Sequence, residues 1–470
     1  MSARVLLPAI SSGILLWLAF FPIDAWLAAY FALVPWLTLV RAEGVGRARR
    51  YLAAFLGGLV FHLLALKWIR VAHPMMELFA WPTLSVYCAL YWPVALALLR
   101  RLDRLGRLPL AFTFPIVWVS LEYFRTHFPT GFPPLQSLHA HQLIGFGWYA
   151  LGYTQHSILP LLQAADLGGV YLISAAVAAV NGAIYEWLIR LRWVRWLLRW
   201  PVEPDTGWLA PSLISSIAIG SVLILMGYGL TSLAHEPFLA GPRVHLLQGN
   251  IPQNEKIIRG DHLPENTVPP LEQEYTRLAA EAYGDGISRR PDLIVWPETC
   301  FAQDWNDLAP DVASGEPGAL AAKLVELEQQ DFRALLRRRF PPANLLLGLN
   351  RRDFVKLWPE NGRYQHESRR YNSAILLRDD PERSLAASYD KIHLVPFGEY
   401  VPLKEWFPWL QKFTPYDHEY SCTPGDRLTR FPLVTRRGTF SFGVLICYED
   451  SDPYLARQYN PASGGEPTDF

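Results

Sequence analysis

The 470-residue chain is 51% hydrophobic and only 18% charged, and its 43 basic residues balance its 43 acidic residues. A net charge of zero gives no indication of nucleic-acid binding. The chain is too long for a single core, so we expect at least two domains. The first half is nearly all apolar, which excludes an ordinary soluble protein over that half.

Seven apolar stretches precede residue 233, and several approach the roughly 20 residues that cross a bilayer. They lie near 5–21, 24–40, 51–67, 77–99, 108–123, 158–188 and 208–232. We therefore predict a multi-pass α-helical membrane domain over 1–232 with about seven spans. Since no secretory cleavage site follows the first stretch, we expect that stretch to be retained.

The loops between these stretches alternate in positive charge. Arginines cluster in three alternate loops, at 41–50, 100–107 and 190–199, whereas the intervening loops carry few. The positive-inside rule places the arginine-rich loops and the N-terminus in the cytoplasm, and residues from 233 onward outside it. If one of the short stretches is not a span, the side of the second domain is reversed.

The connection at 124–157 is too polar to cross the membrane but is rich in aromatic residues, proline and glycine. Aromatic side chains favour the headgroup level of a bilayer. This connection is either an interfacial loop or a structured connector, and the sequence does not decide between the two.

From Pro242 onward, short apolar strands alternate with amphipathic helices. The expected strands lie at 244–248, 293–296, 345–349, 372–377, 385–389 and 439–446, and the expected helices at 271–283 and 319–339. This alternation predicts a layered α/β domain over 233–470 with helices on the outside.

Three of these strands end at residues that can take part in nucleophilic chemistry. Glu298 follows the strand at 293–296, Lys391 follows the strand at 385–389, and Cys447 follows the strand at 439–446. A carboxylate, an amine and a thiol at strand ends can together form a nucleophilic site. Taken alone, a cysteine after Val-Leu-Ile would be a buried structural residue, so the hypothesis depends on all three.

Seven short motifs extend this pattern. They are Gly152–Gln155, Gly168–Tyr171, Gln248–Gln253, Trp296–Glu298, Tyr371–Ser373, Lys391–Pro402 and Ile446–Glu449. From about Val244 to the end, the chain resembles the nitrilase, or carbon–nitrogen hydrolase, superfamily. With a membrane bundle in front of that domain, the chain is similar to the bacterial apolipoprotein N-acyltransferase family.

The resemblance implies a four-layer αββα sandwich with a Glu-Lys-Cys triad. In that triad Glu298 is the general base, Lys391 supplies a positive charge for the oxyanion, and Cys447 is the nucleophile. We expect burial to raise the pKa of Glu298, which suits a base.

Three further residues support the implied site. Glu399 either holds Lys391 or acts as a second acid. Tyr448 and Glu449 follow the nucleophile, and the Tyr448 amide is a candidate donor to the oxyanion.

The reaction that the resemblance implies is a two-step acyl transfer in the bacterial inner membrane, with the catalytic domain on the periplasmic side. A phospholipid donates an acyl chain to the cysteine as a thioester. The chain then passes to the α-amine of a diacylglyceryl-modified apolipoprotein. We expect no cofactor, no metal and no nucleic-acid partner, and the lipid bilayer as the surroundings.

Two alternatives remain open at this point. The first is a membrane-tethered nitrilase-type amidase, although seven spans exceed what a tether needs. The second is a non-enzymatic membrane scaffold or a transporter. A complete triad argues against the scaffold, and the scarcity of ionisable residues in the spans argues against the transporter, with Glu122 and Asp166 among the exceptions.

The sequence departs from the family pattern in two places. Ile257 stands near the position where the family often has tryptophan. The chain also stops at Phe470, before the further strands, the Ser-Asn-Asp-type motif and the last membrane helix of the family. We therefore expect the second domain to be incomplete at its C-terminus.

The remaining cysteines have no zinc-site spacing. Cys88 lies in an apolar run, where we expect it to serve packing. Cys300 and Cys422 both fall in the domain predicted to be extracytoplasmic, where disulfides form. We hypothesise that these two pair and leave Cys447 free.

Overall fold

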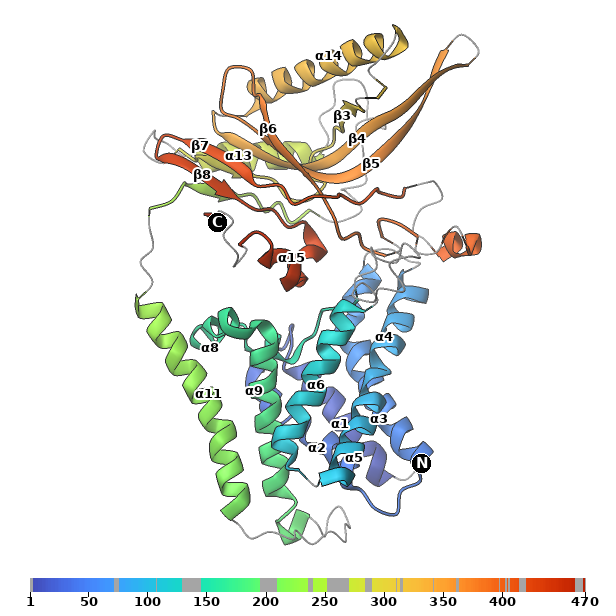
Figure 1. Ribbon diagram of the computed structural model, residues 1–470, viewed down its shortest axis with the longest axis vertical. Helices are drawn as coiled ribbons and strands as arrows, with labels where there is room; N and C mark the ends of the chain where they lie inside the picture. Colours follow the sequence, from blue (N-terminus) through green and yellow to red (C-terminus); the bar gives the residue numbers. More distant parts are fainter. Residues whose placement is uncertain are drawn as a thin grey trace. The chain divides into compact units, whose positions relative to one another are not determined.

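A computed structural model describes most of the chain as two compact units, Met1–Phe238 and Leu239–Phe470 (Figure 1). The described residues are 3–71, 76–106, 108–128, 145–194, 209–235, 240–251, 270–283, 290–309, 311–312, 316–340, 342–360, 363–396, 398–401, 404, 406–413, 420–460 and 468–469.

The first unit is helical, as predicted, and each of the seven apolar stretches contains helix. Its α-helices are α1 (Ala3–Leu18), α2 (Val34–Arg41), α3 (Arg47–Ala65), α4 (Trp81–Ala89), α5 (Tyr91–Gly106), α6 (Leu110–His127), α8 (Leu159–Gln163), α9 (Ala165–Leu188) and α11 (Leu209–His235). Within the described residues, four helical segments are long and apolar enough to cross a membrane: Arg47–Val71, Glu77–Gly106, Ala165–Leu188 and Ser212–His235.

The second apolar stretch is broken rather than continuous. It contains the short 3-10 helix η1 (Trp26–Tyr30) and then α2. The side chain of Asn181 in α9 stabilises this break, because its Nδ2 donates to the Ala29 carbonyl at 2.8 Å and its Oδ1 accepts from the Leu33 amide at 2.9 Å. A buried side chain thus pairs backbone groups that a broken helix leaves without partners.

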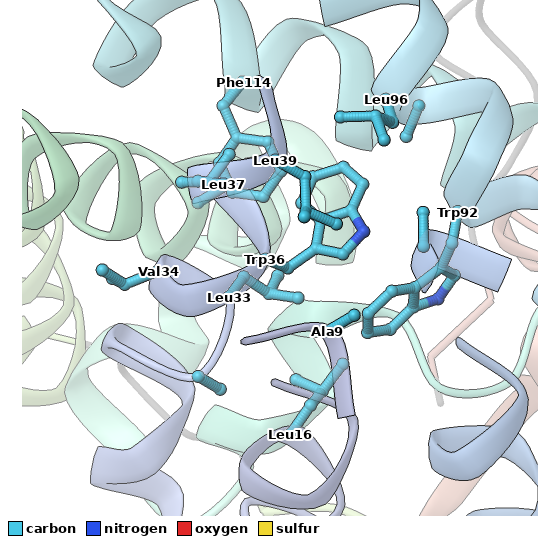
Figure 2. Packing of buried hydrophobic residues seen from close by; sticks show 14 of the residues in the cluster. Ala9, Leu16, Leu33, Val34, Trp36, Leu37, Leu39, Trp92, Leu96 and Phe114 are labelled. Carbon is cyan, nitrogen blue, oxygen red and sulfur yellow. The ribbon is translucent and has the colours of Figure 1, made fainter. Parts of the chain in front are cut away.

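Aromatic rings pack among aliphatic side chains in the core of the first unit (Figure 2). The ring of Trp36 lies 5.8 Å from Trp92 and 6.0 Å from Trp118 between centroids, and both pairs are edge-to-face. Phe114 packs beside the same indole at 6.2 Å. These contacts join α2, α5 and α6 through rings whose edges and faces attract one another.

A partly buried ion-pair cluster links the same helices to α9. Arg41 at the end of α2 binds Glu186 at 3.1 Å and Asp103 at 2.9 Å. Glu186 also accepts the backbone amide of Leu110 at 3.0 Å, at the start of α6. The cluster therefore stabilises one end of the bundle by pairing each partly buried charge.

The second unit contains a six-stranded sheet. Its strands are β1 (Val244–Leu246), β2 (Leu293–Val295), β3 (Trp305–Leu308), β4 (Asn344–Glu360), β5 (Arg363–Leu377) and β6 (Leu385–Asp390). The order is β1-β2-β4-β5-β6, with β3 also paired to β4. The pairs β1–β2 and β2–β4 are parallel, whereas β4–β5 and β5–β6 are antiparallel. The predicted hairpin of β5 and β6 is confirmed, while β3 had no counterpart in the prediction.

Two separate cores lie on the two faces of this sheet. Leu345 and Leu347 of β4 pack against α13 (Pro270–Tyr283) and α14 (Glu316–Arg339). Leu346, between them in sequence, packs against the hairpin of β7 (Phe431–Thr435) and β8 (Gly438–Phe442). Alternation along the strand thus produces the layers of the predicted nitrilase-like sandwich, with helices outside and a second sheet below (Figure 1).

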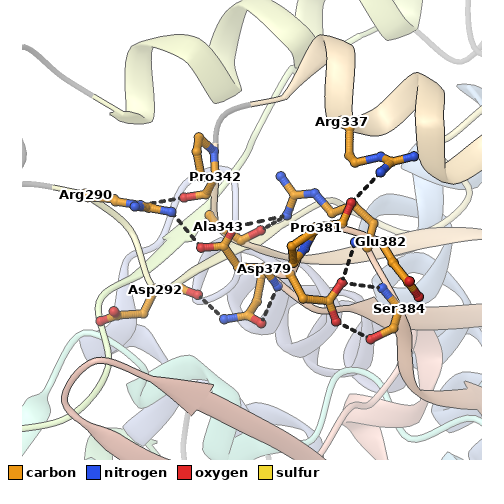
Figure 3. A network of polar contacts seen from close by, with 12 residues as sticks. Arg290, Asp292, Arg337, Pro342, Ala343, Asp379, Pro381, Glu382 and Ser384 are labelled. Carbon is orange, nitrogen blue, oxygen red and sulfur yellow. Dashed lines mark hydrogen bonds and ion pairs between the residues drawn. The ribbon is translucent and has the colours of Figure 1, made fainter.

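A polar network ties together one end of the sheet (Figure 3). Arg290 donates to Asp379 at 2.6 Å and to the Pro342 carbonyl at 2.6 Å. Asn344 donates to the Asp292 carbonyl at 2.8 Å and accepts the Asp379 amide at 3.1 Å. The starts of β2 and β4 are therefore fixed to the turn between β5 and β6, and the chemistry-bearing residues lie at the other ends of these strands.

Helices α1 and α3 cross at very short distance, and this crossing gives a direct test of the bundle. A Cβ added at Gly57 would lie 2.4 Å from the Ala9 carbonyl oxygen, whereas a Cβ at Gly220 in α11 would meet nothing within 4 Å. Gly57→Ala should therefore destabilise the protein by about 1–3 kcal/mol through overpacking. Gly220→Ala should leave stability unchanged or slightly raised, because alanine is the better helix former. Thermal unfolding in detergent measures both, and equal effects of the two substitutions would contradict the close crossing.

Candidate active site

The ends of β2 and β6 and the interior of β5 bring a cluster of polar side chains together. Glu298 follows β2 after Pro297, Asn372 lies on β5, and Lys391 directly follows β6. The Lys391 amide donates to the Asn372 carbonyl at 2.9 Å, which extends the β5–β6 ladder by one bond. Glu298 and Lys391, which the sequence pattern placed at strand ends, therefore meet beside Asn372. The prediction for Cys447 is wrong in one respect, because β8 ends at Phe442 and not at Ile446, so the cysteine does not directly follow a strand.

The ammonium group of Lys391 lies between two carboxylates. Its Nζ is 3.1 Å from Glu298 Oε1 and 2.9 Å from Glu399 Oε2, and the residue is only 1% exposed. The Nδ2 of Asn372 donates to both carboxylates, at 2.6 Å in each case. One buried cation and one amide thus hold two acidic side chains in fixed positions.

Cys447 stands at the start of a short 3-10 helix, η9 (Cys447–Ser451). Its backbone φ is +54°, in the left-handed region that costs a non-glycine residue about 1–3 kcal/mol. The residue is exposed, and its thiol lies close enough to the carboxylate of Glu298 for each group to shift the pKa of the other. A strained turn therefore presents a reachable sulfur atom beside a base.

Glu449 anchors this turn to the segment after Lys391. Its fully buried carboxylate accepts the amides of Ile446 at 2.8 Å, Ile392 at 2.8 Å and His393 at 3.1 Å, and the Tyr389 hydroxyl at 2.7 Å. Burial raises the pKa of Glu449 despite these four hydrogen bonds. Glu449 thus connects the backbone of the cysteine turn to the backbone that carries the lysine.

The protonation states of the cluster follow from its charges. Burial alone would raise the pKa of Glu298, but Lys391, Asn372 and Cys447 outweigh it and hold that pKa below its usual value. The expectation that burial would raise this pKa is therefore wrong. Burial also opposes the charge of Lys391, yet Glu298 and Glu399 raise the pKa of its ammonium.

The thiol is shifted in the opposite sense to its base. Partial desolvation of the sulfur, which stays open to solvent on one side, and the negative charge of Glu298 raise the pKa of Cys447 to about 12, against the opposing effect of Lys391. The resting site therefore holds a neutral thiol beside an ionised glutamate. This arrangement suits transfer of the proton at the moment of attack.

The proposed disulfide between Cys300 and Cys422 is absent, since both are free thiols in different surroundings. Cys300 is packed in the core between the sheet and the helices, where its sulfur lies 3.6 Å from the Tyr275 hydroxyl. The Cys422 amide instead donates to the Glu399 carbonyl at 2.7 Å. The number of cysteines and the predicted extracytoplasmic location suggested this disulfide, but neither indicates how far apart the two sulfur atoms lie.

The sequence analysis did not predict a functional role for two groups of residues at the site. Asn372 was recognised only as part of a motif, although it contacts both glutamates. Arg351 on β4 binds Asp390, the residue before Lys391, at 2.9 Å, and Asp390 also accepts the Ser373 hydroxyl at 2.5 Å. The register of β5 and β6 pairs Ser373 with Asp390, and it is this pairing that would have revealed the contact.

Of the motif residues, Pro252, Gln253, Phe397 and Pro402 lie outside the described residues, as does Ile257.

The layered fold of the second unit is that of the carbon–nitrogen hydrolase class, and Glu298, Lys391 and Cys447 lie together in it. The family model for the carbon-nitrogen hydrolase matches residues 264–464, and the model for the apolipoprotein N-acyltransferase N-terminal domain matches residues 12–183.

Several curated relatives are similar over nearly the whole chain, and each is named apolipoprotein N-acyltransferase. The relative from Geobacter metallireducens is 32% identical over 97% of this chain and 75% of its own length. Those from Rhodopirellula baltica and Aquifex aeolicus are 29% and 24% identical, over 86% and 97% of this chain and 69% and 82% of their own lengths. The chain therefore belongs to the apolipoprotein N-acyltransferase family, and it is an acyltransferase rather than a scaffold or a transporter.

Close approach of the Glu298 loop to β4 predicts how the position of this carboxylate can be disturbed. A Cβ at Gly348 would lie 2.1 Å from the Pro297 carbonyl oxygen and 2.8 Å from the Glu298 Cα, whereas a Cβ at Gly241 would meet nothing within 4 Å. Gly348→Ala should lower the rate of acyl transfer by about 10-fold to 100-fold, because it displaces the carboxylate. Gly241→Ala should keep the wild-type rate. Full activity of Gly348→Ala would show that the placement of Glu298 is not critical.

The raised pKa of Cys447 predicts an unusual pattern of thiol reactivity. Alkylation of this cysteine, followed by peptide mass spectrometry, should keep accelerating beyond a pH of about 8.5, where an ordinary cysteine levels off. Glu298→Gln removes a negative charge that raises the thiol pKa, so alkylation should speed up at a given alkaline pH while acyl transfer is lost. Slower alkylation in this variant would contradict the assignment of a neutral thiol beside an ionised glutamate.

Proposed function

We propose that the chain transfers a fatty acyl chain from a phospholipid to the α-amine of the N-terminal diacylglyceryl-cysteine of an apolipoprotein. The observation that carries this proposal is the ion pair of the Glu298 carboxylate with the buried ammonium of Lys391 at 3.1 Å, next to the exposed thiol of Cys447. Family membership supports the acceptor, and the apolar helices support a lipid donor.

In the first step, Glu298 takes the proton of Cys447 as the sulfur attacks the carbonyl carbon of the acyl ester. The carbonyl oxygen becomes negative, and Lys391 stabilises it. An ammonium has three N–H donors, and the two carboxylates account for two of them among the described residues. Collapse of the intermediate forms the thioester, and Glu298 returns the proton to the departing lysophospholipid oxygen. The Tyr448 amide, which follows the nucleophile in sequence, is a second candidate donor to the oxyanion.

In the second step, the α-amine attacks the thioester carbonyl and gives its proton to Glu298. The sulfur leaves as the amide bond forms, and it recovers a proton from Glu298. Glu298 takes up and returns one proton in each step. Because its pKa is lowered, Glu298 is ionised before each step and can act as a base. Glu399 holds the lysine throughout, since it binds the same ammonium group and also accepts the Val395 amide at 2.7 Å.

The exposed position of Cys447 supports substrates that are large. A phospholipid ester and the end of a lipidated polypeptide both need open access to the sulfur, whereas a small amide does not. We further propose that the helical unit lies in the inner membrane with its arginine-rich loops in the cytoplasm. The catalytic unit then lies on the periplasmic side, where the lipoprotein acceptors are found.

Capture of the acyl chain tests this proposal. The membrane-embedded protein is incubated with phospholipid, and its intact mass is measured before and after hydroxylamine treatment. We expect a fatty-acyl adduct that hydroxylamine removes, that Cys447→Ser abolishes and that Cys422→Ser retains. The adduct should disappear when a diacylglyceryl-cysteine peptide is added, with the chain recovered on the peptide amine.

Other outcomes of the capture experiment contradict the proposal in different ways. An adduct lost to water at the same rate with and without the peptide would favour the membrane-tethered amidase. The absence of an adduct from a protein whose thermal unfolding is normal would contradict the thioester mechanism.

A further inference from the structure

A small cavity in the helical unit is lined by polar side chains as well as aromatic ones. Its volume is about 30 Å³, and its lining includes Phe61, Cys88, Tyr91 and Trp118 together with three ionisable residues. These are His62 of α3 and Glu122 and Arg125 of α6, whose exposed fractions are 1%, 5% and 6%. Placing an ionisable side chain inside an apolar helical bundle costs free energy, so such residues are candidates for a functional or binding role.

Each of the three side chains uses part of its hydrogen-bonding capacity on protein groups. His62 Nδ1 binds the Gly58 carbonyl at 2.8 Å, which makes Nδ1 the donor and leaves Nε2 as an acceptor. Glu122 Oε1 accepts the Leu151 amide at 2.7 Å and the Trp118 indole at 2.8 Å. Arg125 Nη2 donates to the Trp148 carbonyl at 2.8 Å.

One polar atom of each residue is buried without a hydrogen-bond partner in the described part of the chain. These atoms are His62 Nε2, Glu122 Oε2 and Arg125 Nε. Arg125 also interacts electrostatically with both other residues, and all three line the same cavity. The lining of the cavity therefore contains two acceptors and one donor, and leaving all three unpaired would be strongly unfavourable.

We propose that this cavity is a binding site for an ordered water molecule that joins His62, Glu122 and Arg125. Water has two donors, which match the two acceptors, and it accepts from Arg125 Nε. Buried waters make about three hydrogen bonds, and about 10–15 Å³ is enough for one molecule, so both the number of partners and the volume fit.

The bound water strengthens the attachment of the segment Gly145–Gln155 to α6. Glu122 and Arg125 hold Leu151 and Trp148 directly, and the Phe146 amide donates to the Arg125 carbonyl at 2.7 Å. The water fixes the rotamers of both side chains through their remaining polar atoms. This segment, Gly145–Gln155, is therefore held to α6 through a hydrated ion pair rather than by apolar packing alone.

The thermal stability of the full chain in detergent tests this site, because a bound water and an empty cavity predict Tm changes of opposite sign for the same substitution. His62→Leu removes one acceptor and leaves the water with an unmatched donor, so the Tm should fall by several degrees. If the cavity held no water, the same substitution would remove an unsatisfied buried nitrogen and the Tm would rise. His235→Leu is the matched control, because His235 Nδ1 makes the same contact with a carbonyl four residues earlier but is exposed. Its Tm should stay at the wild-type value.

A structure of the wild-type chain in lipid nanodiscs, at a resolution that shows ordered water, gives the second measurement. We expect one water within hydrogen-bond distance of all three unpaired atoms. An acyl or detergent chain in the cavity, or a direct bond from Arg125 Nε to Glu122 Oε2, would overturn the proposal. A rise in the Tm of His62→Leu, or no change beyond that of the control, would overturn it as well.

Discussion

A buried ammonium between two carboxylates is the interaction on which the site depends. Lys391 is almost completely shielded from water, and a lysine in such a position would lose its proton without compensation. Glu298 and Glu399 keep it charged, and in return it keeps Glu298 ionised. Removing one member of a buried ion pair typically costs about 3–5 kcal/mol because the other charge is left uncompensated, so the lysine and its carboxylates depend on one another.

The sheet provides the rigidity that this interaction needs. Lys391 and Glu298 come from strands on either side of β4 and β5, and Asn372 on β5 binds both glutamates. The cysteine turn, in contrast, belongs to a segment outside that sheet. Glu449 bridges the two parts through backbone amides on both, so the distance between sulfur and base is set by main-chain contacts rather than by flexible side chains.

The sequence predicted those features that depend on local pattern. Apolar length indicated the helical unit, and polar residues after apolar runs indicated Glu298, Lys391 and Cys447, although the strand before Cys447 ends at Phe442. Features that depend on strand register or on competing charges could not be predicted in this way. The contact of Ser373 with Asp390 follows from pairing across two strands, and the double contact of Asn372 follows from two loops that meet over one strand.

The sign of the Glu298 pKa shift shows the same limit. Burial raises the pKa of a carboxyl group and a neighbouring ammonium lowers it, and only the distances decide which effect is larger. At 3.1 Å from Lys391, together with the hydrogen bond from Asn372, the lowering effects prevail. The unpaired Cys300 illustrates the point again, because its burial among apolar side chains between sheet and helices cannot be read from the spacing of cysteines.

The pH dependence of Cys447 acylation tests the central claim most directly. Because the base acts when ionised and its pKa is lowered, the single-turnover rate should be maintained down to a pH below about 4.3, the ordinary value of a glutamate, and fall only beneath it. In Asn372→Leu, which removes one hydrogen bond to the carboxylate, this acidic fall should move to higher pH. A fall near neutral pH in the wild-type protein, or an unchanged position in the variant, would contradict an ionised Glu298 held by Lys391 and Asn372.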